Sequence, residues 1–285
     1  MTAAGGAARC VDLHMHSTAS DGSRSPTDVL RAAARAKLAA IALTDHDTVA
    51  GLAEAERAGQ ELGVRVVPGV ELSAVEGDTE THLLGLHLRE TGVLDRALTG
   101  LREMRERRAR RIVERLDAVG VHITMDAVLA QAADGAVGRP HVARALIAEG
   151  WAVDSRDAFD RYLAAGRPAY VPKEQLGMRD AIAMIHEAGG LAVLAHPAAS
   201  GTRDRLVALR AQGLDGVEVR HPSHSAAEIS RLAALARELE LVPSGGSDWH
   251  GASEGPRTIG MMQVPAEWLS AQEERLATLG RAPAA

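Results

Sequence analysis

Asp12-Leu13-His14-Met15-His16, at the end of a strand predicted over residues 9–14, is the stretch that decides the fold. Side chains of an extended chain alternate between two faces, so the two histidines share one face while the leucine and the methionine share the other. Both imidazoles can therefore reach the same metal ion. The stretch predicts a strand with an apolar side for a protein core and a metal-binding end.

Strands of this kind alternate with helical segments along the chain, which is the pattern of parallel β/α units. Ser25-Pro26-Thr27-Asp28, for example, begins a helix with an N-cap serine, a proline in the first turn and an acidic residue that the helix dipole favours. We expect an α/β fold, a distorted seven-stranded (β/α)7 barrel of the TIM type with a helical insertion. The predicted strands cover residues 9–14, 39–43, 64–70, 82–88, 191–195, 216–219 and 241–243.

The alternation breaks over residues 92–171, where the segments look helical and no strand is evident. We therefore expect a flexible tail at 1–9, a barrel domain formed by 10–91 and 172–285, and a helical insertion at 92–171 that caps the substrate site. The arginine-rich stretch 102–115 also carries glutamates, which favours a solvent-exposed helix face with ion pairs. Trp151 and Phe159 are expected in the core of the insertion, and Tyr170 stays open between core packing and stacking on a nucleobase.

The composition argues against several classes of protein. A net charge of −6 disfavours a dedicated duplex DNA-binding protein, because such a protein needs an excess of Lys and Arg to neutralise phosphates. No stretch approaches the roughly 18 consecutive apolar residues of a membrane span, and residues 1–9 lack the apolar centre of a signal peptide. The single cysteine, Cys10, cannot form an internal disulfide, which agrees with a cytoplasmic protein. The oligomeric state stays open.

Candidate metal ligands recur at the ends of the predicted strands. In a β/α barrel the carboxyl ends of the strands converge on one mouth, so ligands that are far apart in the sequence become neighbours. The set comprises more nitrogen and oxygen donors than one ion needs, which predicts a multinuclear site with a bridging carboxylate. Imidazole with carboxylate suits Zn, Mn or Fe. The candidates are His14, His16, Asp21, His46, Glu71, His82, His196, Asp248 and His250.

Each of these short motifs is weak evidence by itself, because a lone His-x-His or Ser-Asp-x-His is more often structural. Their joint occurrence at strand ends is what predicts the site. His87, His122 and His186 lack this placement and are expected to be surface or packing residues. His82 is the least secure ligand because His87 lies on the same predicted strand, and their odd spacing lets only one of them point inward.

In this order along the chain, the motifs resemble those of the polymerase and histidinol phosphatase (PHP) family of metal-dependent phosphoesterases. Gly138-Arg139-Pro140-His141-Val142-Ala143-Arg144 and Ser223-His224-Ser225 make the chain look most similar to a subgroup with a helical insertion. That subgroup contains 3′,5′-nucleotide bisphosphate phosphatases and 5′-to-3′ exoribonucleases that act on short RNA. The other matching motifs are Asp12-Leu13-His14-Met15-His16-Ser17, Ser20-Asp21-Gly22, Thr44-Asp45-His46-Asp47, Gly69-Val70-Glu71, Ala195-His196-Pro197 and Ser247-Asp248-Trp249-His250.

The resemblance implies an enzyme with three divalent metal ions, Mn²⁺ before Zn²⁺ or Fe²⁺. It implies hydrolysis of phosphate monoesters of nucleotides, from 3′,5′-nucleotide bisphosphate to nucleoside 5′-monophosphate, and of short 5′-phosphorylated RNA, by a metal-activated water. Glu71 would bridge the ions. The implied ligand sets are His14, His16, Glu71 and Asp248 for one ion, Glu71, His82 and His196 for a second, and Asp21, His46 and His250 for a third.

Residues outside the cluster are expected to bind phosphate. Arg139 and His141 flank Pro140 at the start of a predicted helix, where backbone amides favour anions and an arginine can hold phosphate with two parallel hydrogen bonds. His224 is the candidate for protonating the leaving oxygen or for binding phosphate. An ordinary surface-loop histidine is the equal alternative for His224.

Two other functions stay open. A histidinol-phosphate phosphatase would use the same cluster on an amino alcohol phosphate, and the phosphate-directed insertion motif argues against it. A non-enzymatic accessory module that binds metal or nucleic acid is the second alternative. Such modules often lack some ligands, whereas this sequence carries a full set.

Overall fold

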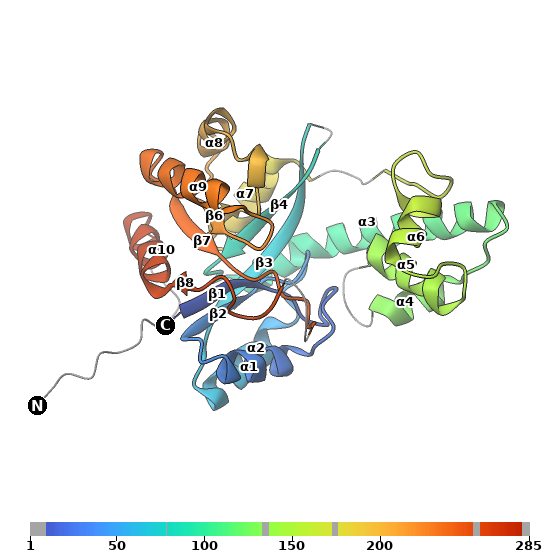
Figure 1. The fold of residues 1–285 in the computed structure, drawn as a ribbon, viewed down its shortest axis with the longest axis horizontal. Coiled ribbons are helices and arrows are strands. Elements are labelled where there is room, and N and C mark those ends of the chain that lie inside the picture. The colour runs from blue at the N-terminus through green and yellow to red at the C-terminus, as the bar shows by residue number, and fades with distance from the viewer. Residues whose placement is uncertain (1–9, 78, 133–136, 173–175, 253–256, 281–285) are drawn as a thin grey trace, which may run out of the picture.

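The computed structural model describes residues 10–77, 79–132, 137–172, 176–252 and 257–280, so the tail predicted at 1–9 lies outside the described residues. An eight-stranded sheet curls into a nearly closed barrel (Figure 1), with the strand order β7-β6-β5-β4-β3-β2-β1-β8. All seven predicted strands are present, and the α/β barrel is confirmed. The strands are β1 Cys10–Met15, β2 Ala40–Leu43, β3 Arg65–Glu76, β4 Thr79–Leu86, β5 Leu191–Leu194, β6 Gly216–Arg220, β7 Val242–Gly245 and β8 Val264–Pro265.

The β3–β4 pair departs from the parallel pattern that the sequence predicts. The two strands form an antiparallel hairpin that pairs from Gly69 with Leu86 to Glu76 with Thr79. Only residues 77 and 78 separate the strands, and a parallel connection would need a crossover of a dozen residues or more. β4 is antiparallel to β5 as well, and the unpredicted β8 adds a short antiparallel edge to β1. The hairpin therefore forms a long wall within a barrel that is otherwise mostly parallel.

The segment that follows β7 closes the barrel against β1. The backbone N–H of Asp248 donates to the carbonyl of His14 (2.9 Å), and the N–H of His16 donates to the carbonyl of Trp249 (2.9 Å). At Gly246 the approach is so close that an added Cβ would lie 2.4 Å from the Cβ of His14. Residues from opposite ends of the sequence thus meet at one point of the barrel mouth.

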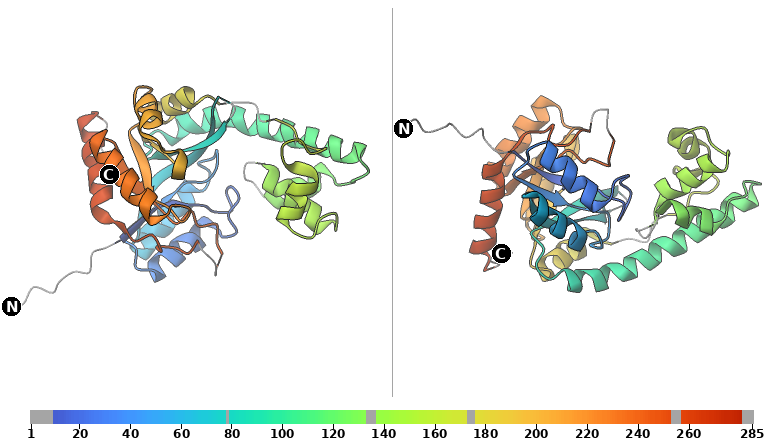
Figure 2. Two further views of the ribbon diagram at one scale, coloured as in Figure 1. Left: turned by 45° about the horizontal axis from the view of Figure 1, so that its top comes forward. Right: turned by 90° about the horizontal axis from the view of Figure 1, so that it is seen from below.

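Most helices cover the outside of the barrel, whereas α3 leaves it and carries the insertion (Figures 1 and 2). Ser25 caps α1 by accepting from the N–H of Asp28, and Ser225 forms a capping box with Glu228 at α9, as the sequence predicts. Among the described residues no helix is long and apolar enough to cross a membrane. The helices are α1 Pro26–Arg35, α2 Leu52–Leu62, α3 Thr91–Ala118, α4 Met125–Ala132, α5 Arg139–Ala148, α6 Ser155–Ala158, α7 Met178–Glu187, α8 Arg203–Arg210, α9 Ala226–Glu238 and α10 Ala266–Thr278, with a π-helix, η1, at Phe159–Leu163 and a 3-10 helix, η2, at Ala198–Ser200.

The insertion has a hydrophobic core of its own. Ile112, Leu116 and Leu146 are buried there, and Trp151 and Phe159 pack against them. The first turns of α3 instead belong to the barrel, because Leu94 and Leu98 share a cluster with residues of α7. The division between the two cores therefore falls inside α3, which acts as a continuous arm between barrel and insertion (Figure 2).

Candidate metal centre and substrate pocket

The predicted ligands converge at the mouth of the barrel. His14 and His16 come from the end of β1, Glu71 from β3 and His82 from β4, and the others follow strand ends or lie in the loop after β1. Every one of them has a ring nitrogen or a carboxylate oxygen within 4.0 Å of another member. Strand-end placement in the sequence has thus become spatial proximity.

Glu71 lies at the centre of this cluster and is almost completely buried. Its two carboxylate oxygens face different histidines. Oε2 lies 3.2 Å from Nε2 of His14, 3.2 Å from Nε2 of His16 and 3.3 Å from Nε2 of His46, and Oε1 lies 3.0 Å from Nδ1 of His82 and 3.1 Å from Nε2 of His196. A carboxylate with histidines on both oxygens is arranged as a bridging ligand would be.

Several sets of these donors are close enough to share one ion, their ligand atoms lying within 4.8 Å of one another. Among the described residues the sets are His16, Asp21, His46 and His250; His14, His16, Glu71 and Asp248; His14, Glu218 and His221; and His46, Glu71 and His82. Two sets contain a predicted ligand group in full. In the remaining predicted group, Nδ1 of His82 and Nε2 of His196 lie 3.3 Å apart beside Glu71. The residues present therefore fit a multinuclear metal centre.

Unsatisfied ring nitrogens give an independent reason to place cations here. Both ring nitrogens of His16 and Nδ1 of His46 are buried without a hydrogen-bond partner. Nε2 of His16 lies 3.2 Å from an oxygen of Glu71 and 3.2 Å from one of Asp248, but without hydrogen-bond geometry. An unmet buried polar group costs about 1–3 kcal/mol. Donors that converge on a common space rather than on each other are expected of metal ligands.

The electrostatics of the cluster also favour bound cations. Burial lowers the pKa of a histidine, and it lowers that of His46 to about 3. Against the same burial, Asp248 and Glu71 raise the pKa of His16 to about 10, and Glu71 and Glu80 raise that of His82 to about 9. The carboxylates therefore impose a negative field that binds protons strongly, and divalent ions compete for the same nitrogens.

Two buried residues of the centre, Glu218 and His221, were not predicted from the sequence. Oε1 of Glu218 lies 3.1 Å from Nδ1 of His14, and its other oxygen accepts from the backbone N–H of His196 (2.7 Å). Nε2 of His221 lies 3.3 Å from Oδ2 of Asp248. Both residues lie at or just after the carboxyl end of β6, which is the placement that identified the other ligands. From this segment the sequence analysis predicted only His224 as a functional residue.

Other acidic residues of the motifs hold the loops in place. Oδ1 of Asp12 accepts from the backbone N–H of Ser247 (2.8 Å), which joins β1 to the segment after β7. Asp45 accepts from the hydroxyl of Ser20 (2.7 Å), next to Asp21. These carboxylates shape the site without facing the central cluster.

The backbone at three strand ends is strained. Asp47, His196 and Asp248 have left-handed φ angles of 49°, 29° and 50°. Non-glycine residues in this region cost about 1–3 kcal/mol each and gather at functional sites. Three of the eight non-glycine residues with positive φ among the described residues thus lie at or beside the candidate ligands.

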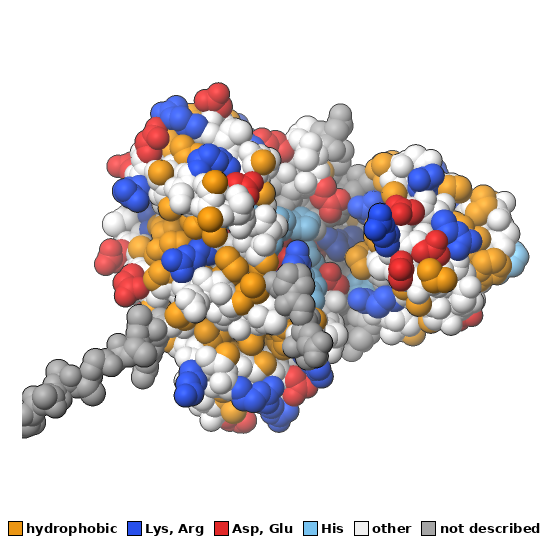
Figure 3. Space-filling model, in the orientation of Figure 1, with side chains coloured by type: hydrophobic (Ala, Val, Ile, Leu, Met, Phe, Trp, Pro, Cys, Tyr) orange, Lys and Arg blue, Asp and Glu red, His pale blue; other side chains and the backbone are white. Residues whose placement is uncertain are grey.

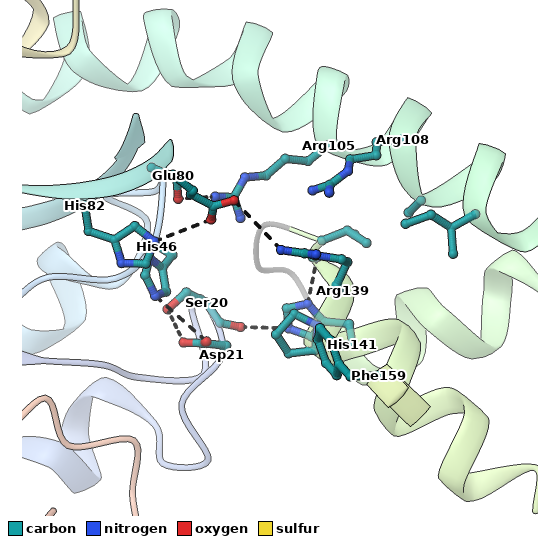
Figure 4. A pocket seen from close by; sticks show the side chains of 16 residues that line it. Ser20, Asp21, His46, Glu80, His82, Arg105, Arg108, Arg139, His141 and Phe159 are labelled. Carbon is teal, nitrogen blue, oxygen red and sulfur yellow. Dashed lines mark hydrogen bonds and ion pairs between the residues drawn. The ribbon is translucent and has the colours of Figure 1, made fainter. Parts of the chain in front are cut away.

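A pocket lies beside the cluster, between the barrel and the insertion. Histidine side chains are visible at the bottom of a hollow between the two parts (Figure 3). The barrel side contributes Asp21, His46 and His82. On the insertion side, Arg105 and Arg108 extend from α3 and Arg139 from the start of α5, with Phe159 nearby (Figure 4). One pocket thus joins the candidate metal centre to three guanidinium groups.

The guanidinium groups make this pocket positive. Burial first, and then the neighbouring Arg139 and Arg105, lower the pKa of Arg108 to about 10. Arg139 lies with its guanidinium carbon 5.7 Å from the ring centroid of Phe159 and its Nη2 3.9 Å from Oε2 of Glu80. Arg105 and Arg108 correct the expectation that the arginine-rich helix is only a solvated face.

Comparison with known proteins identifies the family. The PHP domain model matches residues 12–164, which is more than half of the chain. The PHP prediction is confirmed. This chain belongs to the PHP family. It is 38% identical over 258 residues to the 3′,5′-nucleoside bisphosphate phosphatase of Chromobacterium violaceum, a match that covers 88% of this chain and 90% of that protein.

Other relatives agree with this assignment. The 5′-3′ exoribonuclease of Haemophilus influenzae is 38% identical over 245 residues, or 84% of this chain and 89% of that protein. A crystal structure of a Bifidobacterium adolescentis protein assigned as a metal-dependent phosphoesterase has a TM-score of 0.84 and 33% identity, and covers 94% of this chain and 97% of that chain. The PHP protein is accordingly a metal-dependent hydrolase of phosphate esters.

His141, a predicted phosphate ligand, connects the two parts of the PHP protein. Its Nδ1 accepts from the backbone N–H of Gly138 (2.9 Å), and its Nε2 lies 3.3 Å from the carbonyl of Ser20 in the barrel. The side chain is buried. Both ring nitrogens are used within the protein, so this conformation offers no donor to a phosphate.

His224, the predicted acid, is likewise engaged by the backbone. Its Nδ1 donates to the carbonyl of Val219 (2.9 Å), and its Nε2 accepts from the N–H of Ala198 (3.0 Å). The ring thereby ties the loop after β6 to the loop after β5. Its role as acid or phosphate ligand stays a prediction, and these hydrogen bonds count against it.

The histidines that were predicted to be surface or packing residues form their contacts away from the metal-binding cluster. Nε2 of His87 lies 3.0 Å from Oε1 of Gln272, and His186 contacts Asp215 at 2.8 Å. His122 is exposed and contacts a neighbouring aspartate. None of the three lies in a metal-binding set among the described residues.

Proposed function

We propose that this PHP protein hydrolyses 3′,5′-nucleoside bisphosphates to nucleoside 5′-monophosphates, and that it removes nucleotides from the 5′ end of short 5′-phosphorylated RNA. The two substrates are chemically alike, because each presents a nucleoside with a 5′-phosphate and a scissile phosphorus on its 3′-oxygen. One observation carries the proposal. His46 and His82 of the candidate metal centre line the same pocket as Arg108 and Arg139.

The donors at the barrel mouth are proposed to hold three divalent ions, Mn²⁺ before Zn²⁺ or Fe²⁺. Bound divalent ions supply a nucleophile at neutral pH and neutralise the charge on phosphoryl oxygens. We assign the ligand sets His14, His16, Glu71 and Asp248; Glu71, His82 and His196; and Asp21, His46 and His250. Nearly complete burial of Glu71 excludes bulk water from the centre of this arrangement.

The insertion is proposed to hold the second phosphate of the substrate. Arg139 at the start of α5 and Arg108 on α3 place positive charge opposite the centre, and an arginine binds phosphate through two parallel hydrogen bonds. Phe159 lines the same pocket and offers a ring on which a nucleobase can stack. Together these residues would orient the 3′-ester toward the metal centre.

The alternatives differ in what they demand of this pocket. Histidinol phosphate carries one phosphate, so it would bring no second phosphate to the guanidinium groups of Arg108 and Arg139. An accessory module would need neither turnover nor a complete set of ligands. The cytoplasm stays the proposed compartment, on the basis of the single cysteine.

The test measures phosphate release by Mn²⁺-loaded protein from 3′,5′-adenosine bisphosphate and from histidinol phosphate, and nucleotide release from a 5′-phosphorylated RNA trimer. We expect the wild-type protein to turn over the nucleotide substrates and the His14→Ala variant to have lost this activity. Arg139→Met should raise the KM for the bisphosphate by about 10-fold or more, since one charged hydrogen-bonded contact is worth roughly 1.5–3 kcal/mol.

Arg107→Met is the matched control, because Arg107 is exposed on α3 and pairs with Glu103. Turnover of histidinol phosphate alone would overturn the nucleotide assignment. Absence of turnover with Mn²⁺, Zn²⁺ and Fe²⁺ on all three substrates would favour the accessory module.

A further inference from the structure

A buried ion pair joins the insertion to the strand end that carries His46. Nη2 of Arg105, on α3, contacts Oδ2 of Asp47 and also donates to the hydroxyl of Ser73 on β3 (2.6 Å). The side chain of Asp47 is 2% exposed and that of Arg105 is 14% exposed. This contact belongs to none of the metal-binding sets, and sequence periodicity does not predict it.

Asp47 is held rigidly on the barrel side. Its Oδ1 accepts from the backbone N–H of Ser73 (2.8 Å), and its own N–H donates to the carbonyl of Glu71 (3.0 Å). The backbone at Asp47 is left-handed, and His46 pairs with Glu71 through an isolated parallel bridge. The carboxylate of Asp47 is therefore a fixed point on the barrel side, beside two proposed ligands.

On the insertion side, Arg105 lies close to both proposed phosphate ligands. Arg108 lies three residues further along α3, so the two side chains share one helix face and both line the pocket. Nη1 of Arg105 also lies 3.8 Å from the position that a Cβ at Gly138 would occupy, next to Arg139. The same guanidinium thus contacts the barrel and lies near the start of α5, which presents a proposed phosphate ligand (Figure 4).

We propose that Arg105 and Asp47 are positioning residues that set the distance between the metal centre and the second-phosphate pocket, an inference that rests on the proposed function. Arg105 acts through Asp47, because its Nη2 is engaged by both Asp47 and Ser73. The pair affects turnover of substrates that occupy the metal centre and the second-phosphate pocket at the same time. A phosphate ester that needs only the metal centre is insensitive to it.

The kinetic test compares two substrates in Arg105→Gln and Asp47→Asn. A misplacement near 1 Å costs on the order of 100-fold in rate, so kcat/KM for 3′,5′-adenosine bisphosphate should fall by about 10- to 100-fold. The value for p-nitrophenyl phosphate should change by less than about 3-fold, with the Mn²⁺ content per chain unchanged. Arg105→Lys should recover part of the loss, and Arg110→Gln, an exposed residue of α3 paired with Glu106, should behave as wild type.

Each other outcome overturns the proposal in a distinct way. An equal loss for both substrates together with lost Mn²⁺ would assign the pair to the metal centre itself. A loss in Arg105→Gln that is absent in Asp47→Asn would make Arg105 a direct substrate ligand. Unchanged kinetics in both variants would show that the ion pair does not set the distance between the metal centre and the second-phosphate pocket.

A second measurement is independent of the substrate. Spin labels at Arg31→Cys on α1 and Arg156→Cys in the insertion, in a Cys10→Ala background, report the distance between the two parts by pulsed electron paramagnetic resonance; both sites are well exposed. The distance distribution should broaden in Arg105→Gln and Asp47→Asn but not in Arg110→Gln. An unchanged distribution would refute the positioning role even if the wild type turned over neither nucleotide, in which case the function proposed above would fail separately.

Discussion

Replacement of Glu218 by glutamine tests whether this buried carboxylate orients His14 toward a metal ion. One oxygen of Glu218 lies 3.1 Å from Nδ1 of His14, which leaves Nε2 of that ring facing Glu71 at 3.2 Å. The other oxygen accepts from the N–H of His196 at 2.7 Å. Both carboxylate oxygens thus face donors, whereas a glutamine of the same shape presents one acceptor and one donor.

The magnitude follows from that mismatch. In Glu218→Gln the amide NH₂ must face either the ring N–H of His14 or the N–H of His196, so one donor is left without an acceptor at a cost of about 1–3 kcal/mol in unfolding free energy. Loss of a carboxylate behind a metal-binding histidine typically weakens metal affinity by about 10- to 100-fold. The substitution should therefore raise the Kd for Mn²⁺ by this factor while the fold persists.

The assay is competition for Mn²⁺ between the protein and a fluorescent chelator, with circular dichroism to check the fold. Glu228→Gln is the control, because Glu228 lies in the capping box of α9, is only partly buried and faces no candidate metal ligand. Wild-type Mn²⁺ affinity in a folded Glu218→Gln protein would show that His14 does not depend on this carboxylate.

Three further substitutions test the closure of the barrel, the junction and the insertion. Gly246→Ala places a Cβ against β1, 2.4 Å from the Cβ of His14, so urea unfolding should show a loss of about 1–3 kcal/mol, with weaker Mn²⁺ binding. Burial, with Arg144 second, lowers the pKa of His141 from 6.5 to about 4, so unfolding between these pH values takes up a proton and stability should decrease as the pH is lowered from 6.5 to 4. His141→Gln should remove about 1–3 kcal/mol of that fall in urea unfolding measured across this range; parallel curves for the two proteins would contradict it. Leu116→Ala in the core of the insertion should cost about 2–5 kcal/mol by urea unfolding without changing Mn²⁺ affinity.

The convergence of the candidate ligands was predictable because it follows from two simple rules. The period of two in a strand places His14 and His16 on one face, and parallel strands deliver their carboxyl ends to one mouth. These rules need no knowledge of side-chain contacts. They identified the residues that now surround Glu71, and they would also have identified Glu218 had the end of β6 been treated like the other strand ends.

The β3–β4 hairpin was missed although the sequence carries a signal for it. Gly77-Asp78 lies between the two strands, and Gly-Asp is a dipeptide typical of two-residue hairpin connections. The strands were predicted too short because each turns polar toward the hairpin end, where Glu76 and Thr79 pair. β8 has two residues, and a segment of that length has no measurable period.

The orientation of the arginines on α3 could not be predicted for a different reason. All of them lie on one polar helix of 28 residues, and its sequence does not show which face meets the barrel. That face depends on where α3 leaves the sheet, which is a property of the tertiary structure. Arg105 faces a buried aspartate, whereas Arg110 pairs with Glu106 in solvent. The two arginines are five positions apart and therefore point to different sides of the helix.

The hairpin and the insertion together explain how one barrel can combine general phosphoesterase chemistry with a restricted substrate. Glu71 and His82 occupy facing strands of the hairpin, so its wall carries part of the metal centre, and Glu80 on the same wall borders the pocket of Arg108 and Arg139. In the function proposed above, ester cleavage takes place in the barrel, whereas a second phosphate would be recognised by side chains that α3 and α5 bring from outside it. A change in the insertion should then alter which esters are cleaved before it alters whether any ester is cleaved. Because Asp47 and Ser73 join the barrel to Arg105 of α3, we expect substrate selection to depend on this junction as well as on the pocket itself.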